Sequence, residues 1–135
     1  MHDYSLIFDG GSRGNPGPGY GSYQLTRVAD GKQKTKRLEF GTHVTNNVAE
    51  YRALIAGLED VAAMITAAGR SPSEFSVDIR GDSKLVVEQV NGRWKVRDAG
   101  LQPWHAKAQA LFRSFGKGSS LVWHDRSNSV RTLGH

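Results

Sequence analysis

The segment from Asn47 to Ala68 constrains the fold more than any other part of the chain. Its apolar residues recur with the spacing of one helical face: Val48, Tyr51, Leu54, Ile55, Leu58, Val61, Ala62 and Ile65. Gly69 and Pro72 follow, and both residue types favour the end of a helix. A helix with one apolar stripe must pack against another layer, so the rest of the chain has to supply that layer.

Shorter runs around this helix have the alternating or clustered apolar residues of strands. We expect strands over 4–8, 20–28, 34–40, 75–80 and 120–123, and further helices over 83–90 and 103–115. The first strand is expected to end in a turn at Asp9-Gly10-Gly11, and Asp30-Gly31 to close a hairpin. One or two helical turns are expected after Asp125. This order predicts an α/β protein, with helices packed on a mixed sheet, that forms a single domain over residues 1–135.

Composition narrows the classes of partner and chemistry. The chain has 18 Lys and Arg against 13 Asp and Glu, a net charge of +5 with neutral His, which suits a polyanionic partner. It has no cysteine, which excludes disulfides, zinc-thiolate sites and cysteine nucleophiles. No apolar run is long enough to cross a bilayer, and the first residues do not resemble a secretion signal. We therefore expect a cytoplasmic protein that does not enter a membrane.

Three acidic residues stand where strands and helices can bring them together. Asp9 and Asp82 each follow a strand-like run, and Glu50 lies near the start of the long helix. If the first and fourth strands are parallel neighbours, both aspartates emerge at the same end of the sheet, where open α/β sheets bind their ligands. Three adjacent carboxylates repel one another unless cations neutralise them, and hard oxygen ligands suit Mg²⁺ or Mn²⁺. Two such ions can activate water and stabilise a leaving oxygen in phosphodiester hydrolysis.

Each of these acids also has a purely structural interpretation. Glu50 is three residues after Asn47, a spacing that resembles a helix capping box. Asp82 could cap the helix that begins at Ser83, and Asp9 could form a side-chain turn into Gly10. The sequence alone leaves these alternatives open.

Three motifs together resemble type 1 ribonuclease H, in a short form without a basic protrusion. They are Asp-Gly-Gly-Ser-Arg-Gly-Asn-Pro-Gly-Pro-Gly (9–19), Thr-Asn-Asn-Val-Ala-Glu-Tyr (45–51) and Gly-Asp-Ser-Lys-Leu-Val (81–86). The resemblance covers residues from about Tyr4 to Trp123. It implies a ribonuclease H-like fold, with a five-stranded mixed sheet and helices packed on it. It also implies an endonuclease that uses Mg²⁺ or Mn²⁺, with two ions when substrate is bound. Such an enzyme hydrolyses the RNA strand of RNA–DNA hybrids and leaves 5′-phosphate and 3′-hydroxyl ends.

The resemblance also assigns roles to individual residues. It places three of the family's metal-binding catalytic acids on Asp9, Glu50 and Asp82. Contacts to the hybrid are expected from the glycine-rich segment, from the polar residues of the second motif and from a basic-aromatic patch that remains where other members carry the protrusion. These are Gly10, Gly11, Asn15, Thr45, Asn46, Asn47, Trp94 and Lys95. The patch also fits an ordinary solvated loop.

The family's fourth acid has no obvious counterpart, because no Asp or Glu follows Asp125. One alignment puts Asn128 at that catalytic, metal-binding position and keeps Val130 as the apolar residue that follows it. A second alignment puts Thr132 there, and a third recruits Asp125. We favour Asn128. The family also often has a histidine in the preceding loop, for which Arg126 is a possible substitute.

The missing acid keeps other functions open. The first expectation is an active, monomeric hybrid endonuclease. The alternative is a catalytically weakened hybrid-binding module. A nuclease of the same fold acting on DNA is a third possibility, but the Thr45-Asn46-Asn47 cluster and the glycine-rich segment argue against it. The sequence does not determine the metal preference, the cleavage-site preference or the level of activity.

Overall fold

The structure is a computed structural model that describes residues 2–134, and these residues form a five-stranded mixed sheet. The strand order is β3-β2-β1-β4-β5. β1 pairs antiparallel with β2 and β2 antiparallel with β3, whereas β1 pairs parallel with β4 and β4 parallel with β5. The strands are β1 (Tyr4–Ser12), β2 (Gly19–Arg27), β3 (Lys32–Glu39), β4 (Val77–Gly81) and β5 (Ser120–Trp123). The predicted five-stranded mixed sheet is therefore confirmed.

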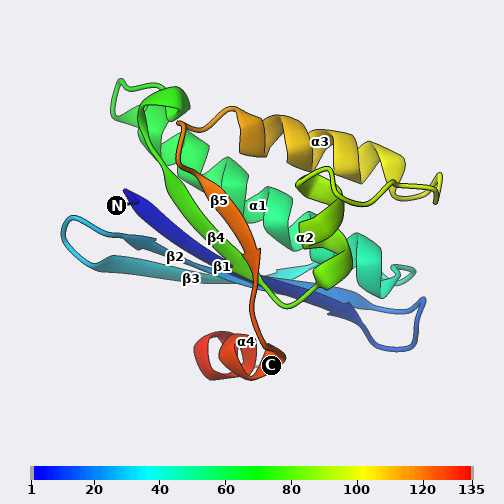
Figure 1. Ribbon diagram of the computed structural model, residues 1–135. Helices are drawn as coiled ribbons and strands as arrows, with labels where there is room; N and C mark the ends of the chain where they lie inside the picture. Colours follow the sequence, from blue (N-terminus) through cyan, green and yellow to red (C-terminus); the bar gives the residue numbers. More distant parts are fainter. Residues whose placement is uncertain (1, 135) are drawn as a thin grey trace.

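Helices lie on both faces of this sheet, but unequally (Figure 1). α1 (Asn46–Ala67), α2 (Lys84–Val90) and α3 (Gln102–Arg113) lie on one side, and the short α4 (Arg126–Leu133) lies on the other. A 3₁₀ turn (Pro72–Glu74) precedes β4. None of the helices within residues 2–134 is long and apolar enough to span a bilayer. Within residues 2–134, the sheet face away from α1 is therefore covered by one two-turn helix.

The core lies between the sheet and α1, as the apolar stripe of that helix predicts. Leu6 and Phe8 of β1 and Leu54 and Leu58 of α1 have no exposed surface. Gly57 lies so close to Leu6 that an added Cβ would be 2.9 Å from its methyl carbons. Burial of each such side chain contributes about 1.5–3 kcal/mol, which anchors α1 firmly over the central strand.

The end of β1 differs from the prediction. A turn was expected at Asp9-Gly10-Gly11, but these residues continue the strand to Ser12. The reason is tertiary: β2 pairs with them throughout, with Asp9 opposite Ser22 and Gly11 opposite Tyr20. The chain reverses over residues 13–18 instead. Asp9 is thus fixed within a paired strand rather than in a turn.

Candidate active site

The three predicted acids lie together beside the central strand β1. Asp9 belongs to β1, Glu50 to α1, and Asp82 directly follows β4. The parallel pairing of β1 with β4 sets Phe8 beside Gly81, so the two aspartates follow paired positions on neighbouring strands. One carboxylate oxygen from each of the three acids lies within 4.8 Å of the others. The expected convergence of these side chains is observed.

Neither helix cap uses these acids. α1 is capped by Thr45, whose hydroxyl accepts a hydrogen bond from the Val48 backbone N–H at 3.2 Å. α2 is capped by Ser83 in the same way. Glu50 and Asp82 therefore do not act as helix caps, which the sequence had allowed, and both belong to the acidic cluster.

Glu50 is held by one side of its carboxylate only. Its Oε1 atom accepts a hydrogen bond from the Gly10 backbone N–H at 3.1 Å. Its Oε2 atom is buried and has no hydrogen-bond partner among the described residues. A buried carboxylate oxygen without a donor is costly unless a cation or a proton satisfies it. The arrangement thus fits a cation-binding site.

The electrostatics of the cluster lead to the same interpretation. Burial raises the pKa of Glu50 well above its usual value, and the neighbouring carboxylates of Asp9 and Asp82 raise it further. Burial raises the pKa of Asp82 to about 6, with the Asp9 carboxylate as the next cause, while Arg126 acts in the opposite direction. Both shifts arise because buried carboxylates close to one another resist ionisation. A divalent cation would remove that repulsion, so these acids suit Mg²⁺ or Mn²⁺.

The acids line an open cavity of about 290 Å³. Four predicted substrate-binding residues line the same cavity: Gly10, Gly11, Asn46 and Asn47. Tyr20 and Ser83 also line it, and the sequence had not indicated them as site residues. Tyr20 could have been suggested only by its pairing opposite Gly11, which the sequence pattern does not reveal. The cavity therefore combines the acids with polar side chains and with the two glycines of β1.

Gly10 is required by packing as well as by any approach of substrate. A Cβ at this position would overlap the backbone carbonyl of Ala49 and lie 2.8 Å from the Glu50 nitrogen. The absent side chain lets β1 and α1 approach closely enough for the Gly10–Glu50 hydrogen bond. The glycine thus sets the position of the buried acid.

Two further predicted residues shape the rim of the cavity. The Asn15 Oδ1 atom accepts a hydrogen bond from the Asn46 backbone N–H at 3.0 Å, and the Asn46 Oδ1 atom accepts one from the Ser12 backbone N–H at 2.8 Å. Thr45 caps α1 beside them. These bonds join the β1–β2 loop to the start of α1. Within residues 2–134, Asn15 and Thr45 do not line the acidic cavity itself.

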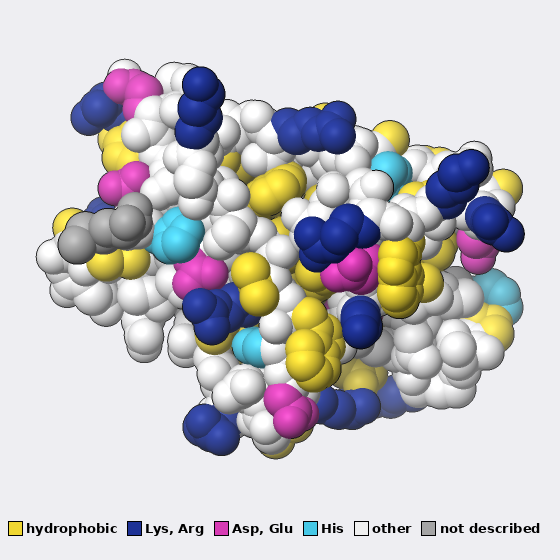
Figure 2. Space-filling view, viewed as in Figure 1, with side chains coloured by type: hydrophobic (Ala, Val, Ile, Leu, Met, Phe, Trp, Pro, Cys, Tyr) yellow, Lys and Arg dark blue, Asp and Glu magenta, His cyan; other side chains and the backbone are white. Residues whose placement is uncertain are grey.

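Trp94 and Lys95 lie in the loop that follows α2 and do not line the acidic cavity within the described residues. Trp94 is 45% exposed, and its predicted contact with the substrate stays a prediction. The Lys95 carbonyl accepts a hydrogen bond from the buried Gln89 side chain at 3.4 Å. Figure 2 shows Lys and Arg side chains spread over this view of the molecule rather than gathered in one broad patch.

The fourth acidic position has three candidate residues in or next to α4: Asp125, Asn128 and Thr132. From α4, the residue that lines the acidic cavity within residues 2–134 is Arg126; Asn128 is half-buried and outside that lining. Val130, whose apolar character favoured the Asn128 alignment, is 46% exposed, and Leu133 is the buried apolar residue of α4. The structure therefore gives no support to the alignment argument, and the role of Asn128 stays a prediction.

The other two candidates for that position have different surroundings. Asp125 caps α4, with its carboxylate accepting a hydrogen bond from the Ser127 backbone N–H at 3.3 Å. Thr132 is half-buried near the end of the helix. Neither lines the acidic cavity within the described part of the chain.

The sheet order and the acidic cluster define a ribonuclease H-like class of protein. A family model described as "Reverse transcriptase-like" matches residues 8–131. Ribonuclease HI from Halobacterium salinarum is 37% identical over 120 residues, which cover 85% of this chain and 52% of that protein. The bifunctional protein Rv2228c of Mycobacterium tuberculosis is 47% identical over 113 residues, which cover 79% of this chain and 27% of that protein. The chain thus spans about a quarter to a half of the length of these curated relatives.

Solved structures give the same result. The N-terminal RNase H domain of Rv2228c, fused to maltose-binding protein, matches with a TM-score of 0.78 at 35% identity, over 98% of this chain and 91% of that chain. RNase H1 from Halobacterium salinarum matches with a TM-score of 0.78 at 34% identity, over 96% and 92% of the two chains. The chain belongs to the Reverse transcriptase-like family, and among its members it is a type 1 ribonuclease H homologue.

Proposed function

We propose that this protein is an endonuclease that hydrolyses the RNA strand of RNA–DNA hybrids with Mg²⁺ or Mn²⁺ and leaves 5′-phosphate and 3′-hydroxyl ends. The observation that carries the proposal is the convergence of Asp9, Glu50 and Asp82 within 4.8 Å, with one buried oxygen of Glu50 that has no donor within residues 2–134. The similarity to ribonucleases H supports the type of substrate. One solved neighbour, LC11-RNase H1 in complex with an RNA/DNA hybrid, has a TM-score of 0.79 at 30% identity.

The three acids fit a divalent cation, so Asp9, Glu50 and Asp82 are the residues that would hold it. When bound, such an ion supplies Lewis acidity and lowers the pKa of a coordinated water. The chain itself fixes the acids: β1 and β4 orient the two aspartates, and the Gly10 N–H orients Glu50. We infer that two ions bind when substrate is present, because phosphodiester hydrolysis needs both the attacking and the leaving oxygen stabilised.

The polar rim of the cavity suits a hybrid substrate. Asn46 and Asn47 are exposed, line the cavity beside the acids and offer short amide side chains. Such groups can contact 2′-hydroxyls and sugar edges across the shallow groove of an A-like duplex. Asn15 holds this rim in place through its hydrogen bond to Asn46. Trp94 and Lys95 are proposed as a second contact, to the backbone and sugars of the duplex away from the acids.

A catalytically weakened hybrid-binding module is the second candidate. The observation that favours it is the presence of Arg126, rather than an acid, where α4 lines the cavity. We nevertheless propose that Asn128 supplies an uncharged oxygen ligand at the fourth position, with Thr132 and Asp125 as the alternatives. Weaker binding of a second ion would then raise the metal concentration needed for activity, but the activity would not be abolished.

One set of assays tests the proposed function. RNA–DNA hybrid, duplex RNA and duplex DNA of the same sequence are incubated with the protein, with and without Mg²⁺ or Mn²⁺. Cleavage of the hybrid that depends on metal supports the proposal. Binding of the hybrid without cleavage in either metal identifies the weakened module, and equal cleavage of duplex DNA rejects the assigned substrate.

A further inference from the structure

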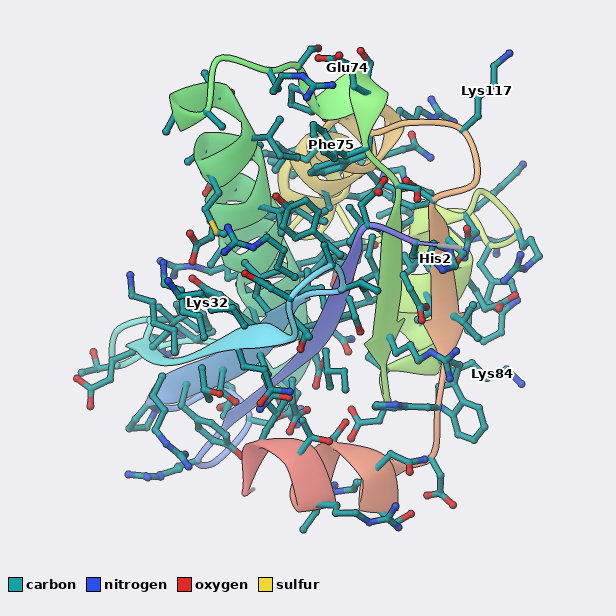
Figure 3. The ribbon with its side chains drawn as sticks, turned by 90° about the vertical axis from the view of Figure 1, so that its left-hand side faces the viewer. His2, Lys32, Glu74, Phe75, Lys84 and Lys117 are labelled. Carbon is teal, nitrogen blue, oxygen red and sulfur yellow. The ribbon has the colours of Figure 1, made fainter. Side chains whose placement is uncertain are left out.

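A second, larger cavity lies beside the acidic one. It has a volume of about 690 Å³ and is lined by Arg13, Tyr20, Gly21, Arg37, Leu38 and Glu39. Arg37 donates a hydrogen bond from Nη2 to the Leu133 carbonyl at the end of α4, at 3.1 Å. The Arg37 side chain therefore lies on the sheet face that α4 partly covers. Figures 1 and 3 show α4 on the side of the sheet away from α1. We call the surface formed by Arg13, Tyr20, Arg37 and Glu39 the arginine groove.

Tyr20 joins the arginine groove to the acidic cavity, because it lines both. Tyr20 is paired with Gly11 across β1 and β2, and its ring reaches over that glycine. A Cβ at Gly11 would lie only 2.6 Å from the Tyr20 hydroxyl oxygen. The two cavities are therefore neighbours along the same strands, and a chain-like ligand in one can continue into the other.

Two guanidinium groups in the groove are held in place by contacts that leave some of their N–H donors available. The Arg13 guanidinium carbon lies 5.8 Å from the centre of the Tyr20 ring, a cation–π distance that leaves its N–H groups available. Arg37 donates one N–H to the Leu133 carbonyl, and a guanidinium has five such donors. Among the described residues, Glu39 is the one acid in the lining of this cavity. The groove therefore presents a positive charge with fixed, forked donors.

The neighbouring lysines of β3 face the other way. Lys34 forms an ion pair with Asp60 of α1 at 2.9 Å, and the Lys36 charge also acts on Asp60. Successive strand residues point to opposite faces, so Arg37 lies on the face away from α1. Lys34 and Lys36 thus lie near Asp60 on the face that carries α1, whereas Arg37 lies in the arginine groove on the opposite face.

We propose that the arginine groove binds phosphate groups of the nucleic-acid strand where it continues beyond the acidic cluster. This inference rests on the proposed function and deepens it. An open, charged groove suits a polyanionic backbone, whereas sites for small molecules are mostly apolar and enclosed. Arginine contacts phosphate through two parallel N–H donors, and each contact releases counterions from the nucleic acid. The groove thus positions the strand and adds affinity without reading sequence.

The test measures binding separately from cleavage. In an Asp82→Asn background, the dissociation constant for a fluorescent RNA–DNA hybrid is measured by anisotropy with Mg²⁺ at several salt concentrations. The test variant adds Arg13→Gln and Arg37→Gln, where the glutamine amide keeps a donor for the Leu133 carbonyl. The matched control adds Lys36→Gln, which removes the same type of charge from the opposite face of the same strand.

We expect the double variant to bind the hybrid roughly tenfold more weakly and to lose about two units of salt slope, one for each phosphate contact. Lys36→Gln should leave both quantities nearly unchanged. If the double variant unfolds, Arg13→Gln alone, in the β1–β2 loop, should show about half of the loss of slope. The proposal would be overturned if Lys36→Gln weakened binding as much as the double arginine variant does, or if neither arginine change had an effect. A parent that binds no hybrid at all would reject the proposed function together with the groove.

Discussion

The Gly10 backbone N–H donates a hydrogen bond to Glu50 Oε1 at 3.1 Å, and this bond joins the central strand to the long helix at the acidic cluster. The second oxygen of the same carboxylate is buried and has no donor in the part of the chain that the structure describes. One carboxylate oxygen of Glu50 is therefore held by the backbone, and the other is available to a cation. The predictions below follow from this division.

Glu50→Gln should lower the rate of hybrid cleavage by about 100-fold or more, because it removes charge that binds the metal ion. The same change should raise the melting temperature of the metal-free protein, since it relieves repulsion from Asp9 and Asp82. Steady-state cleavage and thermal unfolding measure the two effects. A melting temperature that falls while activity is kept would mean that Glu50 stabilises the helix and does not serve the site.

Gly10→Ala should destabilise the protein by about 1–3 kcal/mol, because the new Cβ overlaps the Ala49 carbonyl and neither backbone can give way cheaply. It should also lower activity by displacing Glu50. Gly100→Ala is the matched control: its Cβ would meet only the Asp98 side chain, at 3.1 Å, which can move aside. Urea unfolding compares the two. Equal stabilities for both variants would show that β1 and α1 are not packed as tightly as described.

The metal-free protein should lose stability as the pH rises from about 4 to above 6. The folded-state pKa of Asp82, about 6, lies above its unfolded value of 3.8, and the pKa of Glu50 is raised in the same direction. Protonation is thus favoured in the folded state, so the stabilisation is complete below the unfolded pKa and is lost as the pH passes the folded pKa.

Thermal unfolding across that pH range, with a chelator present, measures the effect. Asp82→Asn should flatten the profile, and saturating Mg²⁺ or Mn²⁺ should restore stability at high pH by binding the ionised cluster. A profile that rises with pH in the metal-free protein would contradict the electrostatic account of the acids.

The fourth position separates three candidates. Asn128→Ala should lower activity strongly and Asn128→Asp should preserve or raise it, while Thr132→Ala should do little. Asp125→Asn should leave activity nearly unchanged, and it should also leave stability nearly unchanged because asparagine caps helices about as well as aspartate. Activity at increasing Mg²⁺ and Mn²⁺ concentrations compares them. Loss of activity in Asp125→Asn with Asn128→Ala unaffected would move the role to Asp125.

The pattern of apolar residues predicted β1, β2, β4, β5 and the longer helices because burial imposes periods of two and 3.6 residues. The exposed β3 was predicted from the Asp30-Gly31 hairpin signal instead. The apolar pattern could not place the end of β1, since Gly10 and Gly11 have no side chains to show a period and only their pairing with β2 keeps them extended. The sequence also could not decide whether Glu50 takes part in a capping box. Asn47 has the right spacing from Glu50, but the residue that caps α1 is Thr45.

The site was predictable to a different degree in each part. Asp9 and Asp82 were predictable because each follows an apolar run, and the parallel pairing of β1 with β4 brings the two positions together. Tyr20 was not predictable, because it enters the cavity only through its pairing with Gly11 on a neighbouring strand. The orientation of α4 was not predictable either. Its buried residues are Ser129 and Leu133, so a polar residue holds an inward position that an apolar pattern does not reveal.

The most direct test of the central claim uses one RNA–DNA hybrid prepared with a label on either strand. We expect the RNA strand to be cut internally when Mg²⁺ or Mn²⁺ is present, the DNA strand to stay intact, and the RNA products to carry 3′-hydroxyl ends that a polymerase can extend. Asp9→Asn should abolish the cleavage. An RNA strand that stays intact at every metal concentration, or a DNA strand that is cut equally, would contradict the account.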